Sequence, residues 1–298
     1  MTVPWTAEAA TARFRGFPPE WLEREYSPSS AINGNYQPYV EAWAKRSAAV
    51  REALLSSSML GVRYGKNVRN IIDVFPAPST NGSPAPTLVF FHGGYWQESS
   101  LRDVSFPAAA LNAAGLTYIS VEYTLAPKAA LSVIVEEARQ AVRFIVDNAA
   151  RFGVDPNRVV LGGHSAGAHL ATFAGEGLTE LNSAPSLLLV SGIFELLPLL
   201  RTSVNTELRL DEAAAGKFSP MRSLANPPIR GKALVAWGEQ DTSEFAWQSQ
   251  HFAQQIRQTN DPDSVQSFEI VRRNHFDVIL DLADRSSKLF LACLGLVN

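Results

Sequence analysis

A serine with a glycine two positions away on either side stands in the middle of the chain, in Gly163-His164-Ser165-Ala166-Gly167. The apolar, β-branched segment 158–161 before this G-x-S-x-G pattern predicts a short buried strand, and the small residues of 168–174 predict a helix after it. A strand-to-helix turn this sharp strains the backbone of its apex residue and holds the Ser165 hydroxyl clear of neighbouring side chains. The pattern alone also occurs in ordinary glycine-rich loops, but the flanking strand and helix favour a nucleophilic serine.

A serine hydroxyl is a weak nucleophile near neutral pH, so it needs a base, and imidazole has a suitable pKa. Of the five histidines, His164 and His169 flank the serine, His92 opens a glycine loop, and His251 lies in a polar segment expected to be a helix with a solvated face. His275 follows the last expected strand, and parallel strands present such residues together at one edge of the sheet. We therefore predict that His275 is the base.

A base of this kind needs a carboxylate that fixes its tautomer and stabilises the imidazolium. Asp241 follows the expected strand 232–237 and reaches the same sheet edge, with Glu239 in the same loop as the competing acid. Asp277 is too close to His275 along the chain to reach its ring well. The order Ser165, Asp241, His275 is that of α/β-hydrolases, which predicts a triad.

The tetrahedral oxyanion of acyl transfer needs backbone donors. His92-Gly93-Gly94-Tyr95-Trp96 follows the expected strand 87–91, where α/β-hydrolases carry such a loop. Paired glycines let N–H groups approach a developing negative charge, so we predict that Gly93, Gly94 and Ala166 supply them. Alone, the loop would be interpreted as a tight turn. His92 is expected to be a structural hydrogen-bonding residue.

The rest of the chain alternates between strand and helix patterns. Further strands are expected at 68–75, 116–123, 186–191 and 265–271, and helices at 41–55, 132–152, 244–258 and 278–294. Buried apolar strands that alternate with helices predict an α/β fold with a mostly parallel sheet covered on both faces, here the α/β-hydrolase fold. Residues 1–60 form an expected N-terminal arm, and 61–298 form the hydrolase domain with a lid-like insertion at 193–228.

The arm and the insertion are rich in large apolar side chains. We expect the aromatics of the arm, which begin with Trp5, to pack on the main body, although part of the arm could roof the site. A connection as long as the insertion is often functional. Phe194 and the four leucines at 196, 197, 199 and 200 could line a substrate pocket or pack on the body, and the sequence leaves both interpretations open.

Composition excludes several classes of function. The net charge is −3 without a basic stretch, which gives no indication of nucleic acid or an anionic membrane as partner. No secretory signal and no apolar run of membrane-spanning length is visible, so the cytoplasm is the expected location. The single cysteine, Cys293, is expected to be a buried thiol. The metal-binding patterns H-x-H and H-E-x-x-H and the nucleotide pattern G-x-G-x-x-G are absent.

The chain resembles a known family in several of these motifs. His92-Gly93-Gly94-Tyr95-Trp96-Gln97 and 163–170 together resemble the kynurenine formamidases (arylformamidases), which are related to the hormone-sensitive-lipase-like esterases. In many of those esterases the loop has the sequence H-G-G-G, whereas here Tyr95 replaces the third glycine, as in the formamidases. The likeness extends through 26–29, 125–128, 189–194, 219–220, 241–245 and 274–277, and so covers the chain from about residue 20 to near its end.

The resemblance implies a cofactor-free serine hydrolase that acts on N-formyl-kynurenine or a similar N-acyl aryl amide. It implies the same triad and oxyanion donors, and Tyr95, Trp96 and Phe194 as candidate substrate-binding residues. Two alternatives stay open: a carboxylesterase or longer-chain N-acyl-arylamine hydrolase with the same triad, and a non-catalytic binding protein on this scaffold. The sequence leaves open the acyl group, the anchor for a substrate carboxylate and whether the chain forms a homo-oligomer.

Overall fold

The structure, a computed structural model, describes residues 14–78, 82–176, 178, 184–223 and 231–297. Its centre is an eight-stranded sheet with the strand order β1-β2-β4-β3-β5-β6-β7-β8. Strand β2 runs antiparallel to both of its neighbours, β1 and β4, and all other neighbouring pairs are parallel. The predicted α/β fold with a mostly parallel sheet is therefore confirmed. The strands are β1 (Met59–Arg63), β2 (Ile71–Phe75), β3 (Ala85–Phe91), β4 (Thr117–Val121), β5 (Val154–His164), β6 (Ser186–Val190), β7 (Ala233–Gly238) and β8 (Val265–Ile270).

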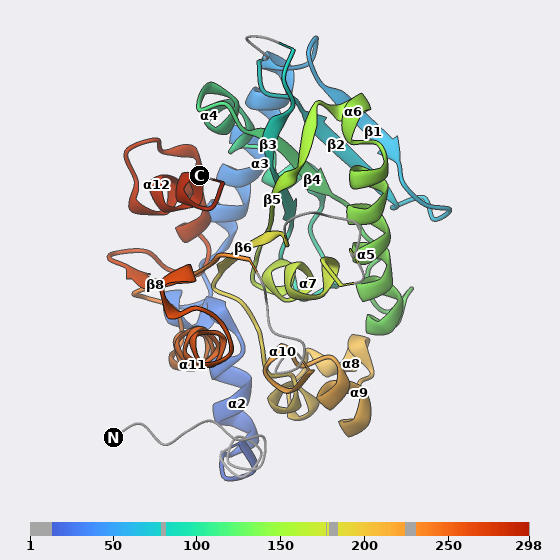
Figure 1. The fold of residues 1–298 in the computed structure, drawn as a ribbon. Helices are drawn as coiled ribbons and strands as arrows, with labels where there is room; N and C mark the ends of the chain where they lie inside the picture. Colours follow the sequence, from blue (N-terminus) through green and yellow to red (C-terminus); the bar gives the residue numbers. More distant parts are fainter. Residues whose placement is uncertain (1–13, 79–81, 177, 179–183, 224–230, 298) are drawn as a thin grey trace.

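Successive side chains of a strand point to opposite faces of its sheet, and here both faces are buried. In β3, Val89 and Phe91 join one apolar core while Leu88 and Phe90 join the other. Helices α5 (Leu131–Asp147), α7 (Ala166–Ala174) and α11 (Ser243–Thr259) supply the first core. Helices α3 (Gln37–Ala53), α4 (Ala108–Ala113) and α12 (Lys288–Gly295) supply the second. Figure 1 shows α5 and α7 on one side of the sheet and α3, α4 and α12 on the other.

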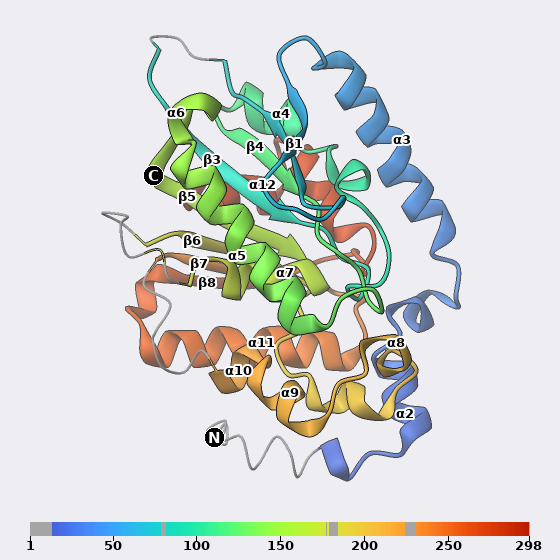
Figure 2. The same ribbon diagram turned by 90° about the vertical axis from the view of Figure 1, so that its right-hand side faces the viewer.

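The first helices of the arm lie with the insertion at one end of the molecule, whereas α3, later in the arm, runs along the molecule toward the other end (Figure 2). The arm contributes α2 (Pro19–Glu25) and the 3₁₀ helix η1 (Pro28–Ile32). The insertion contributes η3 (Leu197–Arg201), α8 (Asn205–Leu208), α9 (Glu212–Lys217) and α10 (Pro220–Ser223), and α2 packs on η3. Trp5 and the last part of the expected insertion, 224–228, lie outside the described residues. Elsewhere lie η2 (Leu101–Val104), α6 (Ala149–Phe152), η4 (Pro262–Ser264) and η5 (Val278–Ala283).

Two expected helices are interrupted. The segment 132–152 divides at Asn148 into α5 and α6. The closing segment 278–294 is the 3₁₀ helix η5 followed by α12, because Ser287 caps α12 by accepting a hydrogen bond from the N–H of Phe290. Cys293 on α12 is fully buried, as expected. In the described part of the chain, no helix combines the length and apolar character needed to cross a membrane.

Candidate active site

The carboxyl ends of five neighbouring strands bring the predicted site residues to one edge of the sheet. Strand β5 ends at His164, and Ser165 follows it with φ 55° and ψ −120°, a conformation that residues other than glycine rarely adopt. The N–H of Ser165 donates to the carbonyl of Val190, and its carbonyl accepts from the N–H of Ala168 as α7 begins. The expected sharp strand-to-helix turn is thus present at Ser165.

The turn depends on two glycines. A Cβ atom on Gly163 would lie 2.2 Å from the backbone of Gly167, and one on Gly167 would lie 2.0 Å from the carbonyl oxygen of Phe91. Neither position therefore has room for a side chain. Because of this close approach, α7 begins directly after the elbow. The N–H groups of its first turn, including that of Ala166, have no partner within the helix and point back toward the elbow.

His275 and Asp241 form a buried pair on the loops after β8 and β7. Nδ1 of His275 lies 2.7 Å from Oδ1 of Asp241, and both side chains are almost fully buried. A carboxylate only accepts, so Nδ1 carries the proton and Nε2 is left as the basic nitrogen. The imidazole ring lies 4.7 Å from the ring of His164, which places it beside the elbow.

The two competing acids are occupied elsewhere. Glu239 accepts a hydrogen bond from the N–H of Arg272, and Asp277 accepts from the N–H of Asn274. The structure therefore brings Asp241, and neither of these carboxylates, to the ring of His275.

The glycine loop after β3 packs directly against the elbow. A Cβ on Gly93 would lie 3.1 Å from the carbonyl oxygen of His164 and 3.2 Å from Cβ of Ser165. Gly94 has φ 99°, and its carbonyl accepts from the N–H groups of Gln97 and Glu98, which folds the loop into a turn. The loop thus presents glycine backbone within contact distance of the Ser165 side chain.

His92 anchors the base of this loop. Its ring is fully buried, stacks on Tyr123 at 4.2 Å, and places Nε2 3.1 Å from Oε1 of Glu122. Arg69 also contacts that carboxylate. Burial alone would raise the pKa of Glu122, but its hydrogen bond to His92 and the charges of His92 and Arg69 outweigh burial and lower it. These contacts are those of the structural residue expected at this position.

The three candidate substrate-binding residues differ in their surroundings. Trp96 is fully buried with its indole against the ring of His169, and Phe194 is fully buried and stacked on Phe252 at 4.1 Å. Both belong to the packed core, so neither presents surface to solvent. Tyr95 is partly buried, and its hydroxyl donates to the backbone carbonyl of Tyr26 in the arm.

Three neighbours of the site have roles that the sequence analysis did not predict. The hydroxyl of Ser191 donates to Oδ2 of Asp241 at 2.6 Å, and Nε2 of His164 donates to the carbonyl of His275 at 2.8 Å. Glu25 of the arm accepts from Ser243, two residues after Asp241. Ser191 directly follows β6 at the same sheet edge, so its position was an available signal, whereas the contact of Glu25 has no signature in the sequence. His251, expected on a solvated face, is half-buried and stacked on Trp247.

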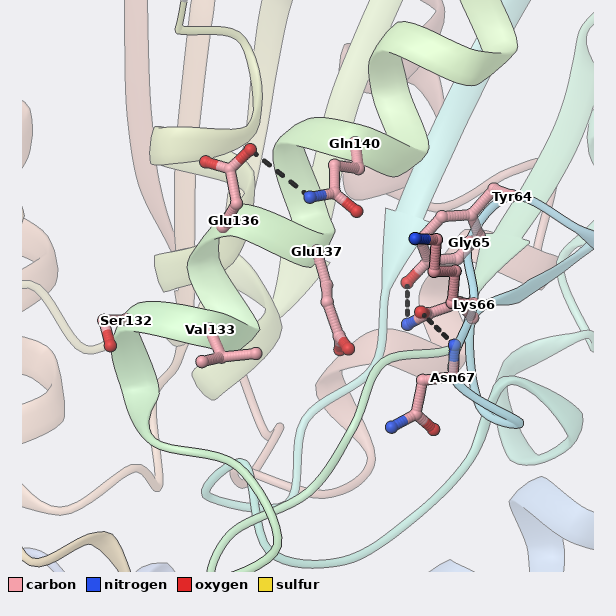
Figure 3. Close-up of a pocket in the computed structure, with 10 residues that line it drawn as sticks. Tyr64, Gly65, Lys66, Asn67, Ser132, Val133, Glu136, Glu137 and Gln140 are labelled. Atoms are coloured by element: carbon pink, nitrogen blue, oxygen red, sulfur yellow. Dashed lines mark hydrogen bonds between the residues drawn. The ribbon is translucent and has the colours of Figure 1, made fainter.

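A surface pocket of about 930 Å³ lies apart from these residues. Figure 3 shows the side chains of α5 on one wall and the turn between β1 and β2 on the other. The carboxylate of Glu137 in its lining accepts hydrogen bonds from the N–H and hydroxyl of Thr124, so its role is structural. Ser165, Asp241 and His275 are not among the residues that line this pocket, and we do not assign the chemistry to it.

A mostly parallel sheet with a strained serine after its central strand and a His–Asp pair on two later loops defines an α/β-hydrolase. The chain is 30% identical to a kynurenine formamidase from Danio rerio, over 92% of this chain and 96% of that protein. It belongs to the kynurenine formamidase family.

Three further comparisons place the chain among related hydrolases. A family model described as BD-FAE matches residues 72–186. The crystal structure of a thioesterase candidate from Silicibacter sp. TM1040 matches with a TM-score of 0.80 and 27% identity, over 93% of this chain and 98% of that one. An isoprenylcysteine alpha-carbonyl methylesterase from Arabidopsis thaliana is 30% identical over 57% of this chain and 44% of its own length. The chain is thus an enzyme of a hydrolase family, and its relatives include esterases.

Proposed function

We propose that the protein is a serine hydrolase that removes the formyl group from an N-formyl aryl amide such as N-formyl-kynurenine. The observation that carries the proposal is the His275–Asp241 pair, 2.7 Å apart, beside the strained elbow of Ser165. Membership of the kynurenine formamidase family supports the formyl aryl amide as substrate. The buried location of the pair supports an acyl-transfer site from which bulk water is largely excluded.

In the first half of the reaction, Oγ of Ser165 attacks the formyl carbon and its proton passes to Nε2 of His275. The N–H groups of Gly93, Gly94 and Ala166 donate to the oxyanion of the tetrahedral intermediate. The intermediate collapses as the C–N bond breaks, and His275 gives its proton to the departing arylamine. Ser165 then carries the formyl group as an ester.

In the second half, His275 takes a proton from water as the water oxygen attacks the formyl ester. The same backbone donors stabilise the second tetrahedral intermediate. When it collapses, the proton on His275 returns to Oγ of Ser165 and formate leaves. Asp241 holds the Nδ1 proton throughout and stabilises each imidazolium state, and its own charge is held by Ser191 and the N–H of Gly238.

The test compares wild type with Ser165→Ala on N-formyl-kynurenine and on p-nitrophenyl acetate. We expect Ser165→Ala to lower kcat by about a thousandfold or more on both substrates, because no other group forms the acyl-enzyme. Fast deformylation by wild type, with activity that falls as formyl is replaced by acetyl and butyryl, supports the formamidase assignment. Activity that survives in Ser165→Ala contradicts the mechanism, and an unchanged midpoint of unfolding in the variant controls for misfolding.

The second candidate function is ester or longer-chain N-acyl-arylamine hydrolysis by the same residues, which the similarity to a methylesterase favours. Strong activity on the p-nitrophenyl ester with negligible deformylation would move the assignment to this function and keep the serine mechanism.

A further inference from the structure

The glycine loop against the elbow contains consecutive residues in an unfavourable backbone conformation. Tyr95 has φ 49° and Trp96 has φ 58°, and neither is a glycine. A residue other than glycine in this conformation is strained, and it persists only where its surroundings hold it in place. The preceding residues, Gly93 and Gly94, are the proposed oxyanion donors, so whatever fixes Tyr95 also fixes their N–H groups.

Tyr95 is fixed through its side chain to the arm. Its hydroxyl donates a 2.5 Å hydrogen bond to the backbone carbonyl of Tyr26, 69 residues away in the sequence. Burial, with a smaller contribution from the charge of Glu23, raises the pKa of Tyr95 well above its ordinary value, so the hydroxyl keeps its proton and remains a donor. Trp96 is held independently by burial and by the N–H of Ala126, which donates to its carbonyl.

The same point of the arm also holds the loop that carries the acid. The carbonyl of Glu25 accepts from the hydroxyl of Thr242 at 2.5 Å, and its carboxylate accepts from the N–H and hydroxyl of Ser243 at 3.0 and 2.6 Å. These two residues directly follow Asp241 and begin α11. Two adjacent arm residues, Glu25 and Tyr26, therefore connect the oxyanion loop on one side of the site to the acid loop on the other.

We propose that Tyr95 is a positioning residue whose hydroxyl ties the oxyanion loop to Tyr26 of the arm and so holds the N–H groups of Gly93 and Gly94 toward the developing oxyanion. The proposal rests on the proposed function, and it differs from the substrate-binding role predicted for Tyr95 from the sequence. A contact that acts only on the oxyanion loop stabilises the transition state more than the bound substrate. Its loss therefore lowers kcat and leaves KM nearly unchanged.

The chain offers a matched control. The hydroxyl of Tyr118, fully buried on β4, donates a hydrogen bond of the same length, 2.5 Å, to the backbone carbonyl of Val104. Tyr118 belongs to the core on the other face of the sheet from Tyr26. Tyr95→Phe and Tyr118→Phe therefore delete the same kind of bond, and only Tyr95→Phe deletes it from the oxyanion loop.

The experiment measures kcat and KM for deformylation, the inhibition constant of phenylboronic acid and the midpoint of thermal unfolding. Phenylboronic acid forms a tetrahedral adduct with an active serine. We expect Tyr95→Phe to lower kcat about tenfold, less than the loss of a whole oxyanion donor, with KM unchanged and inhibition by the boronic acid weakened in parallel. Tyr118→Phe should leave kcat, KM and the inhibition constant unchanged, while its midpoint of thermal unfolding falls by about as much as that of Tyr95→Phe.

A raised KM with unchanged kcat in Tyr95→Phe would mean that Tyr95 contacts substrate, and would overturn the proposal. Equal kinetic losses in the two variants would overturn it too, because the effect would then be one of general packing. If Tyr95→Phe does not fold, Thr242→Val removes the hydroxyl bond to the carbonyl of Glu25, the residue before Tyr26, and so loosens from the acid loop the arm segment to which Tyr95 is tied. For that variant, an unchanged kcat is the overturning result. Failure of the proposed function is separate, since it would appear as activity in Ser165→Ala or as no inhibition of wild type by the boronic acid.

Discussion

His275 and His164 lie beside Ser165, the proposed nucleophile, and their hydrogen bonds differ. His275 carries its proton on Nδ1 toward Asp241, so Nε2 is free to act as base. His164 donates from Nε2 to the backbone carbonyl of His275 at 2.8 Å. Burial lowers the pKa of His164 well below its ordinary value, and the nearby charge of His275 lowers it further. His164 therefore stays neutral near neutral pH and, through its hydrogen bond, supports the backbone of His275, the proposed base.

We predict that His164→Ala lowers kcat/KM about tenfold, because the carbonyl of His275 loses its donor and the base becomes less well positioned. His164→Gln, whose side-chain amide also donates, should recover much of the loss. The measurement is kcat/KM against pH for both variants and wild type. Full activity in His164→Ala, or equal losses in the two variants, would show that the hydrogen bond does not position the base.

The helices and strands that depend on local patterns of residues could be predicted from the sequence. Apolar runs identified seven of the strands, and the glycines at 163 and 167 predicted the elbow between β5 and α7. β1 was not expected, because it is short, only partly buried and interrupted by Gly61 at φ 69°. The helix breaks before α12 because the side chains of Asp284 and Ser287 accept hydrogen bonds from nearby backbone N–H groups. The pattern of apolar residues does not indicate such bonds. The hydrogen bonds between Glu25 and Ser243 and between Tyr26 and Glu244 each join residues 218 positions apart, and no periodic pattern in the sequence predicts them.

The close contact between Gly167 of α7 and the end of β3 can be tested by mutation. Gly167→Ala would place a methyl group 2.0 Å from the carbonyl oxygen of Phe91, so we expect it to cost about 3 kcal/mol or more of unfolding free energy, or to prevent folding. Gly216→Ala in α9 is the control. A Cβ there meets no atom within 4 Å, and alanine favours a helix by roughly 0.5–1 kcal/mol over glycine. Urea unfolding of both variants checks this, and a Gly167→Ala protein as stable as wild type would disprove the close crossing.

The molecule as a whole carries buried histidines whose protonation is linked to folding. His169 on α7 is fully buried, and Nε2 donates to the carbonyl of Phe218 in the insertion. Burial lowers the pKa of His169 to about 4, although that hydrogen bond partly opposes the shift. In the unfolded chain its pKa is about 6.5, so between these values the unfolded state binds a proton that the folded state does not.

We therefore predict that the free energy of unfolding falls as pH drops from about 7 to 4. His169 alone should account for about 2 kcal/mol between pH 8 and pH 5, and His164 acts in the same direction. Urea unfolding at several pH values measures the slope. His169→Gln, whose amide keeps a donor but does not titrate, should give a shallower slope. Identical slopes in the two proteins would contradict the assignment.

The glycines of the elbow also bear on how such an enzyme can evolve. Every single-base change of a glycine codon that alters the residue adds a side chain or ends the protein, and neither Gly163 nor Gly167 has room for one. We therefore expect selection to remove substitutions at these two positions. A descendant enzyme that acts on a new substrate must have changed at other residues. The segment of the arm around α2 and the insertion lie together at one end of the molecule, where Glu23 bonds to Ser203 and the loop after β3 bonds to both segments through Tyr95 and Gln97. We expect natural variation in substrate preference to accumulate there, around an elbow that stays the same.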